Sequence, residues 1–171
     1  MDLKSLIRDV PDFPAKGVMF RDITTLLKDP EGLVESIDVI AEKLKDIDFD
    51  MVLGPESRGF IFGMPLAYKL KKGFIPARKK GKLPAETAKT AYVLEYGEAV
   101  IEIHKDAVVP GSKIVIVDDL LATGGTAKAV AELLTELGAE VVGMVFLIEL
   151  VGLGGRGILK PFKNIHSVLE Y

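Results

Sequence analysis

The sequence predicts an α/β fold in which a mostly parallel, twisted sheet is flanked by helices. A short apolar run at 51–53 precedes a helical pattern at 60–71, and a β-branched run at 114–117 precedes another helical pattern at 127–137. Short runs rich in valine and isoleucine are typical of strands that are buried on both faces of a parallel sheet. Their alternation with helices indicates an α/β architecture with its ligand site beyond the carboxyl ends of the strands.

The composition is that of an ordinary globular protein, and we expect one domain over residues 1–171. A chain of 171 residues with 49% hydrophobic and 27% charged residues is long enough to bury a substantial core. The net charge of −3 argues against a nucleic-acid or membrane-surface partner. The absence of cysteine excludes disulfides, thiolate metal sites and a cysteine nucleophile.

Neither a leader nor a membrane span is expected. Residues 1–10 interleave acids and bases and lack an apolar core of the signal-peptide kind. The most apolar stretch, 141–150, is too short to cross a bilayer and contains Glu149. The cytoplasm is therefore the expected location.

The N-terminal part of the chain predicts two helices. Apolar residues at helical spacing (Leu3, Leu6, Ile7 and Val10) predict a short amphipathic helix over 2–10. The prolines that follow at positions 11 and 14 end it. The pair Asp29-Pro30 is a typical helix start, with an acid at the N-cap and proline in the first turn. This second helix is expected to run to about Lys45.

Further strands are expected at 74–77, 141–147 and 165–169, and residues 78–98 interrupt the alternation. Two extended arms, 92–96 and 100–104, are joined through Gly97. Because long insertions in compact domains are usually functional, we interpret about 78–104 as a mobile flap over the site, with a solvated basic loop as the alternative.

Residues 152–157 formally match the dinucleotide fingerprint G-x-G-x-x-G. We reject this interpretation, because no helix can open properly into Lys160-Pro161 and the chain ends before an acid about 20 residues on could lie on a second strand.

The stretch with the clearest chemical signature follows the strand at 114–117. Two carboxylates, Asp118 and Asp119, end the strand, and a loop of small residues at 122–126 leads into the helix. Paired glycines let backbone N–H groups converge, and the first helical turn adds unpaired donors and a positive dipole end, which together favour phosphate. The carboxylates favour hydroxyl groups beside that phosphate, as in a ribose 5-phosphate. The alternative is local N-cap and turn chemistry without a ligand.

This stretch, Val117-Asp-Asp-Leu-Leu-Ala-Thr-Gly-Gly-Thr126, resembles the 5-phosphoribosyl 1-pyrophosphate (PRPP) motif of type I phosphoribosyltransferases, in the form found in adenine phosphoribosyltransferases. Most of the chain shares the resemblance, which extends to the following segments: Phe13-Pro14, 17–23, 57–60, 78–84, 94–97 and Glu149-Leu150. One departure is Gly54-Pro55-Glu56, where many members carry a Gly-Leu-Asp type of sequence, so that the role of Glu56 stays open.

The resemblance implies a type I phosphoribosyltransferase fold with a flexible hood, and the synthesis of AMP and pyrophosphate from adenine and PRPP with Mg²⁺. It implies that Mg²⁺ is carried by PRPP or pyrophosphate and has no direct protein ligand. It also implies a homodimer. The implied ribose and 5-phosphate residues are Asp118, Asp119, Ala122, Thr123, Gly124, Gly125 and Thr126, and the implied pyrophosphate residues are Arg58, Arg78, Lys79 and Lys82.

For the base, the resemblance implies that backbone groups of Met19 and Arg21 bind the purine edge while Phe20 and Leu150 cover its faces. The Arg21 side chain is expected to form a structural ion pair instead of contacting the base. Glu95 is implied as general acid or base, with Asp118 and Asp119 as the other catalytic groups.

Two rival functions stay open at this point. A phosphoribosyltransferase for a 6-oxo purine is one. A PRPP-sensing transcription regulator is the other, although there is room for only one short helix before Phe13.

Overall fold

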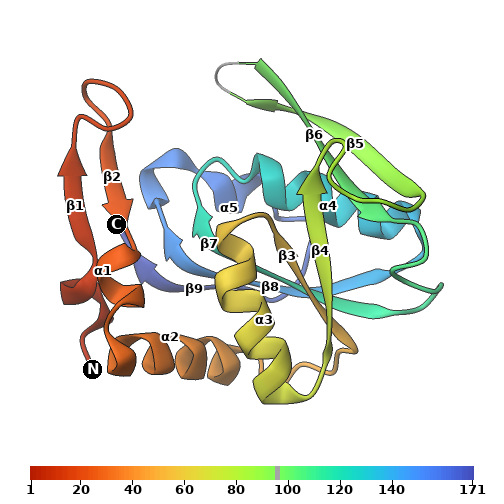
Figure 1. Cartoon of the computed structure of the whole chain (residues 1–171), viewed down its shortest axis with the longest axis horizontal. Coiled ribbons are helices and arrows are strands. Elements are labelled where there is room, and N and C mark those ends of the chain that lie inside the picture. The colour runs from red at the N-terminus through yellow and green to blue at the C-terminus, as the bar shows by residue number, and fades with distance from the viewer. Residues whose placement is uncertain (95–96) are drawn as a thin grey trace. The chain divides into compact units, whose positions relative to one another are not determined.

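The computed structural model describes residues 1–94 and 97–171, and within them the chain forms two compact units, 1–39 and 40–171 (Figure 1). Each unit is described by itself. Across the described residues, every helix is too short or too polar to pass through a bilayer.

The first unit is built around a small antiparallel hairpin. A 3₁₀ turn, η1 (Leu3–Leu6), leads into β1 (Arg8–Pro11), which pairs with β2 (Met19–Asp22) so that Val10 lies opposite Phe20. A single-turn helix, α1 (Thr24–Leu27), follows.

The helix predicted over 2–10 is therefore wrong beyond Leu6. Leu3 and Ile7 are buried, as an amphipathic helix would have them, but the chain from Arg8 onward is extended. A helix of nine residues is marginal in water. The backbone groups of β2 offer Arg8 to Pro11 a ladder of hydrogen bonds that the helix cannot match.

The predicted helix start at Asp29-Pro30 is confirmed. Helix α2 (Pro30–Lys43) begins at the proline, and Oδ1 of Asp29 accepts a hydrogen bond from the Gly32 amide at 2.7 Å. The aspartate therefore satisfies one of the unpaired donors of the first turn. The helix ends at Lys43, two residues short of the expected Lys45.

The second unit contains a mixed sheet whose centre is parallel. Its strands are β3 (Met51–Pro55), β4 (Gly73–Lys79), β5 (Thr87–Leu94), β6 (Gly97–His104), β7 (Lys113–Leu121), β8 (Glu140–Glu149) and β9 (Ile165–Glu170). In the described part of the chain their order is β5-β6-β4-β3-β7-β8-β9. The pairs from β4 through β3, β7 and β8 to β9 are parallel, whereas β4–β6 and β5–β6 are antiparallel. The predicted fold class is confirmed.

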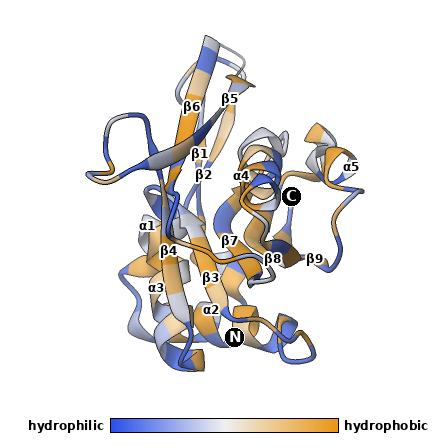
Figure 2. Ribbon diagram, turned by 90° about the vertical axis from the view of Figure 1, so that its right-hand side faces the viewer, coloured by the Kyte–Doolittle hydropathy of each residue, from blue (hydrophilic) through white to orange (hydrophobic). Residues whose placement is uncertain are grey.

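Helices α3 (Arg58–Leu70) and α4 (Gly125–Glu136) lie on opposite faces of this sheet (Figures 1 and 2). Covered on both sides, the β7 residues Ile114 to Val117 are fully buried, which explains their unbroken apolar character.

The insertion predicted at 78–98 is more regular than expected, because its two arms form a long hairpin. Strand β5 begins at Thr87, within a stretch whose sequence pattern is weak, and Thr87 pairs with His104 on β6. Ala88 and Tyr92 pack against the core of the unit, which fixes the register that polar neighbours leave undefined. Glu95 lies outside the described residues.

A single-turn helix, α5 (Gly155–Ile158), forms in the glycine-rich stretch after η2 (Val151–Leu153). The turn ends at Ile158, so no helix continues into Lys160-Pro161, as expected. One turn fits before Lys160-Pro161, but it is too short to be the helix of a dinucleotide site.

Candidate active site

A cavity of about 310 Å³ lies at the carboxyl ends of β3 and β7. Because these strands are parallel neighbours, the loop that follows each one reaches the same edge of the sheet, as the sequence predicted. The residues that line it are Pro55, Glu56, Ser57, Arg58, Lys79, Tyr92, Ile101, Asp118, Asp119, Leu120, Leu121, Ala122, Thr123, Gly124, Gly125, Thr126 and Ala127.

The loop Ala122–Gly124 ends at the start of α4, and we call it the phosphate loop. Gly124 has φ of +84°, a left-handed conformation that only glycine adopts at little cost, and it is the N-cap of the helix. The first intrahelical bond runs from the Lys128 amide to the Gly124 carbonyl at 3.0 Å. The amides of residues 125–127 precede that bond, so they are available to an anion together with the positive end of the helix dipole.

Two neighbouring carboxylates lie beside this loop. Asp118 is partly buried, Asp119 is only 4% exposed, and Oδ1 of Asp118 accepts a hydrogen bond from the Asp119 amide at 2.9 Å. Burial raises the pKa of Asp118 well above its usual value, and the charge of Asp119 raises it further. Burial also raises the pKa of Asp119, against the opposing effect of Arg58. Perturbed acids in a cavity are a common mark of a functional site.

Arg58, the first residue of α3, forms an ion pair with Asp119, with 3.0 Å between Nε and Oδ2. The cation expected at the pyrophosphate therefore lies against one of the two acids. The carboxylate is almost buried while the guanidinium is about 40% exposed, so the pair stays open to solvent and ligand on the arginine side.

Glu56 holds the end of β4, a role that the sequence left open. Its Oε1 accepts hydrogen bonds from the Lys79 amide at 2.8 Å and from Nε of Arg78 at 3.2 Å. Nη1 of Arg78 also donates to the Lys82 carbonyl at 3.3 Å. Glu56 thus fixes the start of the basic segment that the resemblance assigns to pyrophosphate. The sequence signal that could have indicated this role is the position of Glu56 in the loop that follows a strand.

The cavity brings together Arg58, Lys79, both aspartates and the whole of 122–126 from the predicted set. Among the described residues, Arg78 and Lys82 lie beside this lining instead of in it. Tyr92 and Ser57 line the cavity although neither was assigned a role. Tyr92 lies on β5, and its place in the cavity could be predicted only from the register of the β5–β6 hairpin.

The predicted base residues fall in both units. Leu150 follows β8, and its amide donates to the Leu121 carbonyl at 2.9 Å. Met19, Phe20 and Arg21 belong to β2 of the first unit, where the Arg21 side chain makes the expected ion pair, with Asp9. That this side chain does not contact the base stays a prediction.

Phe20 packs edge to face against Phe13, with ring centroids 5.1 Å apart. This aromatic contact joins β2 to the loop that precedes it.

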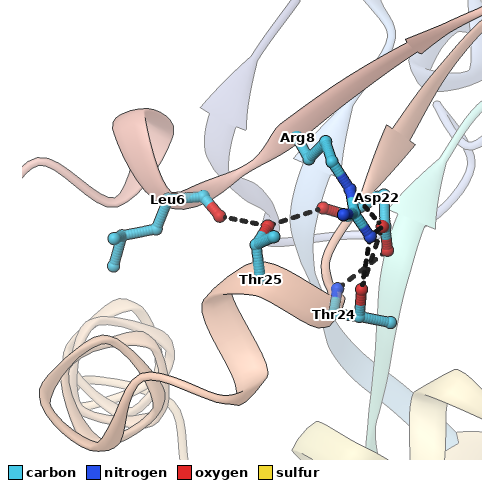
Figure 3. Close-up of polar contacts among 5 residues, drawn as sticks. All are labelled: Leu6, Arg8, Asp22, Thr24 and Thr25. Atoms are coloured by element: carbon cyan, nitrogen blue, oxygen red, sulfur yellow. Dashed lines mark hydrogen bonds and ion pairs between the residues drawn. The ribbon is translucent and has the colours of Figure 1, made fainter.

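A polar cluster fixes the end of β2 (Figure 3). Asp22 accepts hydrogen bonds from the Thr24 amide and hydroxyl, each at 2.9 Å, and from Nε of Arg8 at 2.9 Å. The Thr24 amide and the Arg8 guanidinium lower the pKa of Asp22 to about 2. The Thr25 hydroxyl donates to the Leu6 carbonyl at 2.6 Å, which ties α1 back to η1. The cluster holds the segment 19–21 in place within its unit.

Comparison with known proteins identifies the family. Residues 22–167 match the family model described as phosphoribosyl transferase domain. An adenine phosphoribosyltransferase of a Synechocystis species is 60% identical over 173 residues, with all of both chains covered. The chain belongs to the adenine phosphoribosyltransferase family.

Solved structures of this family agree with that assignment. The adenine phosphoribosyltransferase of Thermoanaerobacter pseudethanolicus is 51% identical, with a TM-score of 0.96 over 99% of this chain and 98% of that one. The Giardia lamblia enzyme, solved as a complex with 9-deazaadenine, is 34% identical, with a TM-score of 0.92 over 99% and 96% of the two chains. Membership confirms the type I phosphoribosyltransferase fold and the enzyme class that the resemblance implied.

Proposed function

We propose that the chain transfers the 5-phosphoribosyl group of PRPP to adenine, forming AMP and releasing pyrophosphate, in purine salvage. The observation that carries the proposal is the cavity in which two acids lie beside a glycine loop at a helix start. Its family membership assigns the substrates, since its relatives are adenine phosphoribosyltransferases.

In the proposed complex, the phosphate loop binds the phosphate group of the ribose 5-phosphate and the two acids bind its hydroxyl groups. The amides at the start of α4 and the hydroxyls of Thr123 and Thr126 donate to the phosphate. Asp118 and Asp119 accept hydrogen bonds from the ribose hydroxyls. As the bond at C1 breaks, positive charge develops on the ring, and nearby carboxylates favour it. A well-placed electrostatic group of this kind contributes about 10²–10³ in rate.

The leaving pyrophosphate takes the basic side of the cavity. We assign it to Arg58, Arg78, Lys79 and Lys82, because charge-assisted bonds from these cations offset the negative charge that develops on the leaving group. Arg58 exchanges Asp119 for phosphate oxygens as PRPP binds, while the ribose hydroxyls take over the carboxylate.

Mg²⁺ is the proposed cofactor. Among the described residues, His, Asp and Glu side chains nowhere gather in threes with the geometry of a metal site. We assign the ion to the phosphate oxygens of PRPP, since Mg²⁺ is commonly bound through substrate phosphates and at most one or two carboxylates. When bound, Mg²⁺ supplies positive charge to the pyrophosphate.

Adenine is assigned to Met19, Phe20, Arg21 and Leu150. Backbone N–H and C=O groups of β2 distinguish an amino group from a keto group at the purine 6-position, because a mismatched polar edge leaves buried groups unpaired. Phe20, held by Phe13, supplies an aromatic face.

Glu95 is the proposed acid or base for the purine nitrogen proton, and the hairpin β5–β6 is proposed as the flap that excludes water. The change Glu95→Gln should lower kcat and remove the corresponding step from its pH profile. An unchanged profile would take Glu95 out of proton transfer.

We further propose a cytoplasmic homodimer with one phosphoribosyltransferase domain per chain. The apolar residues Met64 and Tyr68 on α3 are 49% and 86% exposed, which supports burial against a second copy. Light scattering coupled to size exclusion measures the mass directly, and a monomer at micromolar concentration would refute the dimer.

The activity is tested by incubating the purified chain with PRPP, Mg²⁺ and one purine at a time. We expect AMP and pyrophosphate from adenine, and little turnover of hypoxanthine, guanine or xanthine. Preference for a 6-oxo purine would overturn the adenine assignment. The variant Asp118→Asn serves as the control that links the turnover to this cavity.

A further inference from the structure

The glycine-rich stretch 152–157, rejected as a dinucleotide site, contains an arginine that connects three segments of the second unit. Arg156 on α5 donates from Nε to Oε1 of Glu149 at 3.1 Å, and its Nη2 donates to Oε2 of the same carboxylate. Its Nη1 donates to the Ile165 carbonyl at 2.7 Å, and Nη2 also contacts the Ser167 hydroxyl at 3.0 Å. One guanidinium thus fastens α5 to the end of β8 and to β9.

The contacts of Arg156 differ from a surface ion pair because their carboxylate partner, Glu149, is buried. The residue is only 5% exposed, and its Oε2 also accepts a hydrogen bond from the Ser167 hydroxyl. The Arg156 guanidinium lowers the pKa of Glu149, so the carboxylate stays charged at neutral pH. A buried carboxylate held by a bidentate arginine is costly to break, because removing one partner leaves a charge unpaired.

The helix that Arg156 anchors lies directly against the phosphate loop. A Cβ on Gly155 would come within 2.3 Å of the Ala122 carbonyl oxygen and 3.0 Å of the Gly124 nitrogen. A Cβ on Gly124 would come within 2.8 Å of the Gly155 carbonyl oxygen and 2.9 Å of the Ile158 side chain. The two backbones therefore touch, and the loop can keep its shape only while α5 stays where it is.

We propose that Arg156 is a positioning residue for ribose 5-phosphate: by clamping α5 to Glu149 and β9, it holds the phosphate loop in its binding conformation. Among the described residues, Arg156 is absent from the cavity lining, so it acts through α5 and does not contact the substrate. The inference rests on the proposed function for the identity of the ligand. It gives the glycine-rich segment that follows Glu149 a role in shaping the site.

The deciding variant is Arg156→Lys. Lysine keeps the positive charge beside Glu149, but a single ammonium group lacks the planar fork that joins the carboxylate to the Ile165 carbonyl. Calorimetry with ribose 5-phosphate and, separately, with Mg²⁺-pyrophosphate measures the two halves of the cavity. We expect ribose 5-phosphate to bind about 10- to 100-fold more weakly, because small displacements of binding groups cost that much.

Pyrophosphate binding should stay as in the wild type, since its proposed cations come from α3, from β4 and from Lys82 just after β4, none of which carries a clamp residue. In turnover, KM for PRPP should rise more than kcat falls. The control is Lys113→Gln, which removes an exposed partner of Asp48 at the other end of β7 and should change neither affinity.

Equal affinity of Arg156→Lys and the wild type for ribose 5-phosphate would overturn the inference, as would parallel losses for both ligands. If Arg156→Lys does not fold, the double variant Glu149→Gln/Arg156→Gln, which removes both charges together, gives the same readout. If the wild-type chain binds ribose 5-phosphate but makes no AMP from adenine, the proposed function is refuted, and the proposed positioning role of Arg156 is not.

Discussion

Two adjacent glycines of the site should respond in opposite ways to the same substitution. Gly124 and Gly125 both stand at the start of α4, so exchange for alanine adds one methyl group at neighbouring chain positions with different surroundings. At Gly124 the backbone has φ of +84° and the methyl group would overlap the Gly155 carbonyl oxygen. At Gly125 the nearest atoms are the Val93 carbonyl oxygen at 3.8 Å and the Tyr92 ring at 3.9 Å, which is ordinary contact.

The magnitudes follow from these geometries. Holding alanine in a left-handed conformation costs about 1–2 kcal/mol, and forcing a methyl group into a packed contact costs about 1–3 kcal/mol more. Since domains of this kind have free energies of unfolding of about 5–15 kcal/mol, Gly124→Ala should fold, with its loop displaced. Gly125→Ala should match the wild type or gain about 0.4–1 kcal/mol, because alanine restricts the unfolded chain.

Urea unfolding and PRPP saturation kinetics on both variants test this reasoning. We expect Gly124→Ala to lower the midpoint of unfolding and to raise KM for PRPP at least about tenfold, whereas Gly125→Ala should leave the midpoint of unfolding nearly unchanged. A Gly124→Ala protein as stable and as tight as the wild type would show that the loop does not need its left-handed residue. Greater damage from Gly125→Ala would refute the packing argument.

Three further changes probe the charges. Asp118→Asn should lower kcat about 10²–10³-fold and raise Tm at neutral pH. In the wild type, the Asp118 carboxyl keeps its proton to higher pH in the folded state than in the unfolded state. The stability of the wild type therefore falls as pH rises above 3.8. The Tm gain should disappear near pH 4. Asp22→Asn should lower Tm at neutral pH. The pKa of Asp22, about 2 in the folded state, stabilises the wild type above pH 3.8, and this contribution is lost as pH falls toward 2. Circular dichroism during acid titration of the wild type and the variant measures the difference. Glu56→Gln should cost about 1 kcal/mol of unfolding free energy and weaken pyrophosphate binding in calorimetry, since Arg78 loses its charged partner.

The central sheet could be predicted because its signals are local. The run at 114–117 is β-branched and apolar throughout, and burial on both faces demands this whatever the neighbouring strands are. The start of α2 likewise depends on Asp29 and Pro30 alone. Where structure depended on a distant partner, the sequence was insufficient: Arg8 to Pro11 became a strand because β2 lies beside it, and β5 began at Thr87 because β6 pairs with it.

The site divides in the same way. The phosphate loop and its acids are consecutive in the chain, so their chemistry could be predicted from ten residues. The partners of the charged groups could not, because they are decided by which strand ends meet. Glu56 lies two residues from Arg58 in the chain, but the parallel pairing of β3 with β7 brings Arg58 to Asp119, and Glu56 pairs with Arg78.

The Arg58–Asp119 ion pair offsets part of the charge in this cavity. Burial disfavours the ionised forms of both aspartates, and Arg58 opposes this at Asp119. PRPP carries hydroxyl donors and phosphate oxygens on one molecule, so a single ligand can satisfy the acid and the guanidinium as they separate. In the proposed complex, binding would replace one ion pair by two sets of charge-assisted hydrogen bonds. A ligand with only one of the two halves should bind more weakly. Phosphate alone offers no hydroxyl groups to Asp119, and ribose alone offers no phosphate oxygens to Arg58.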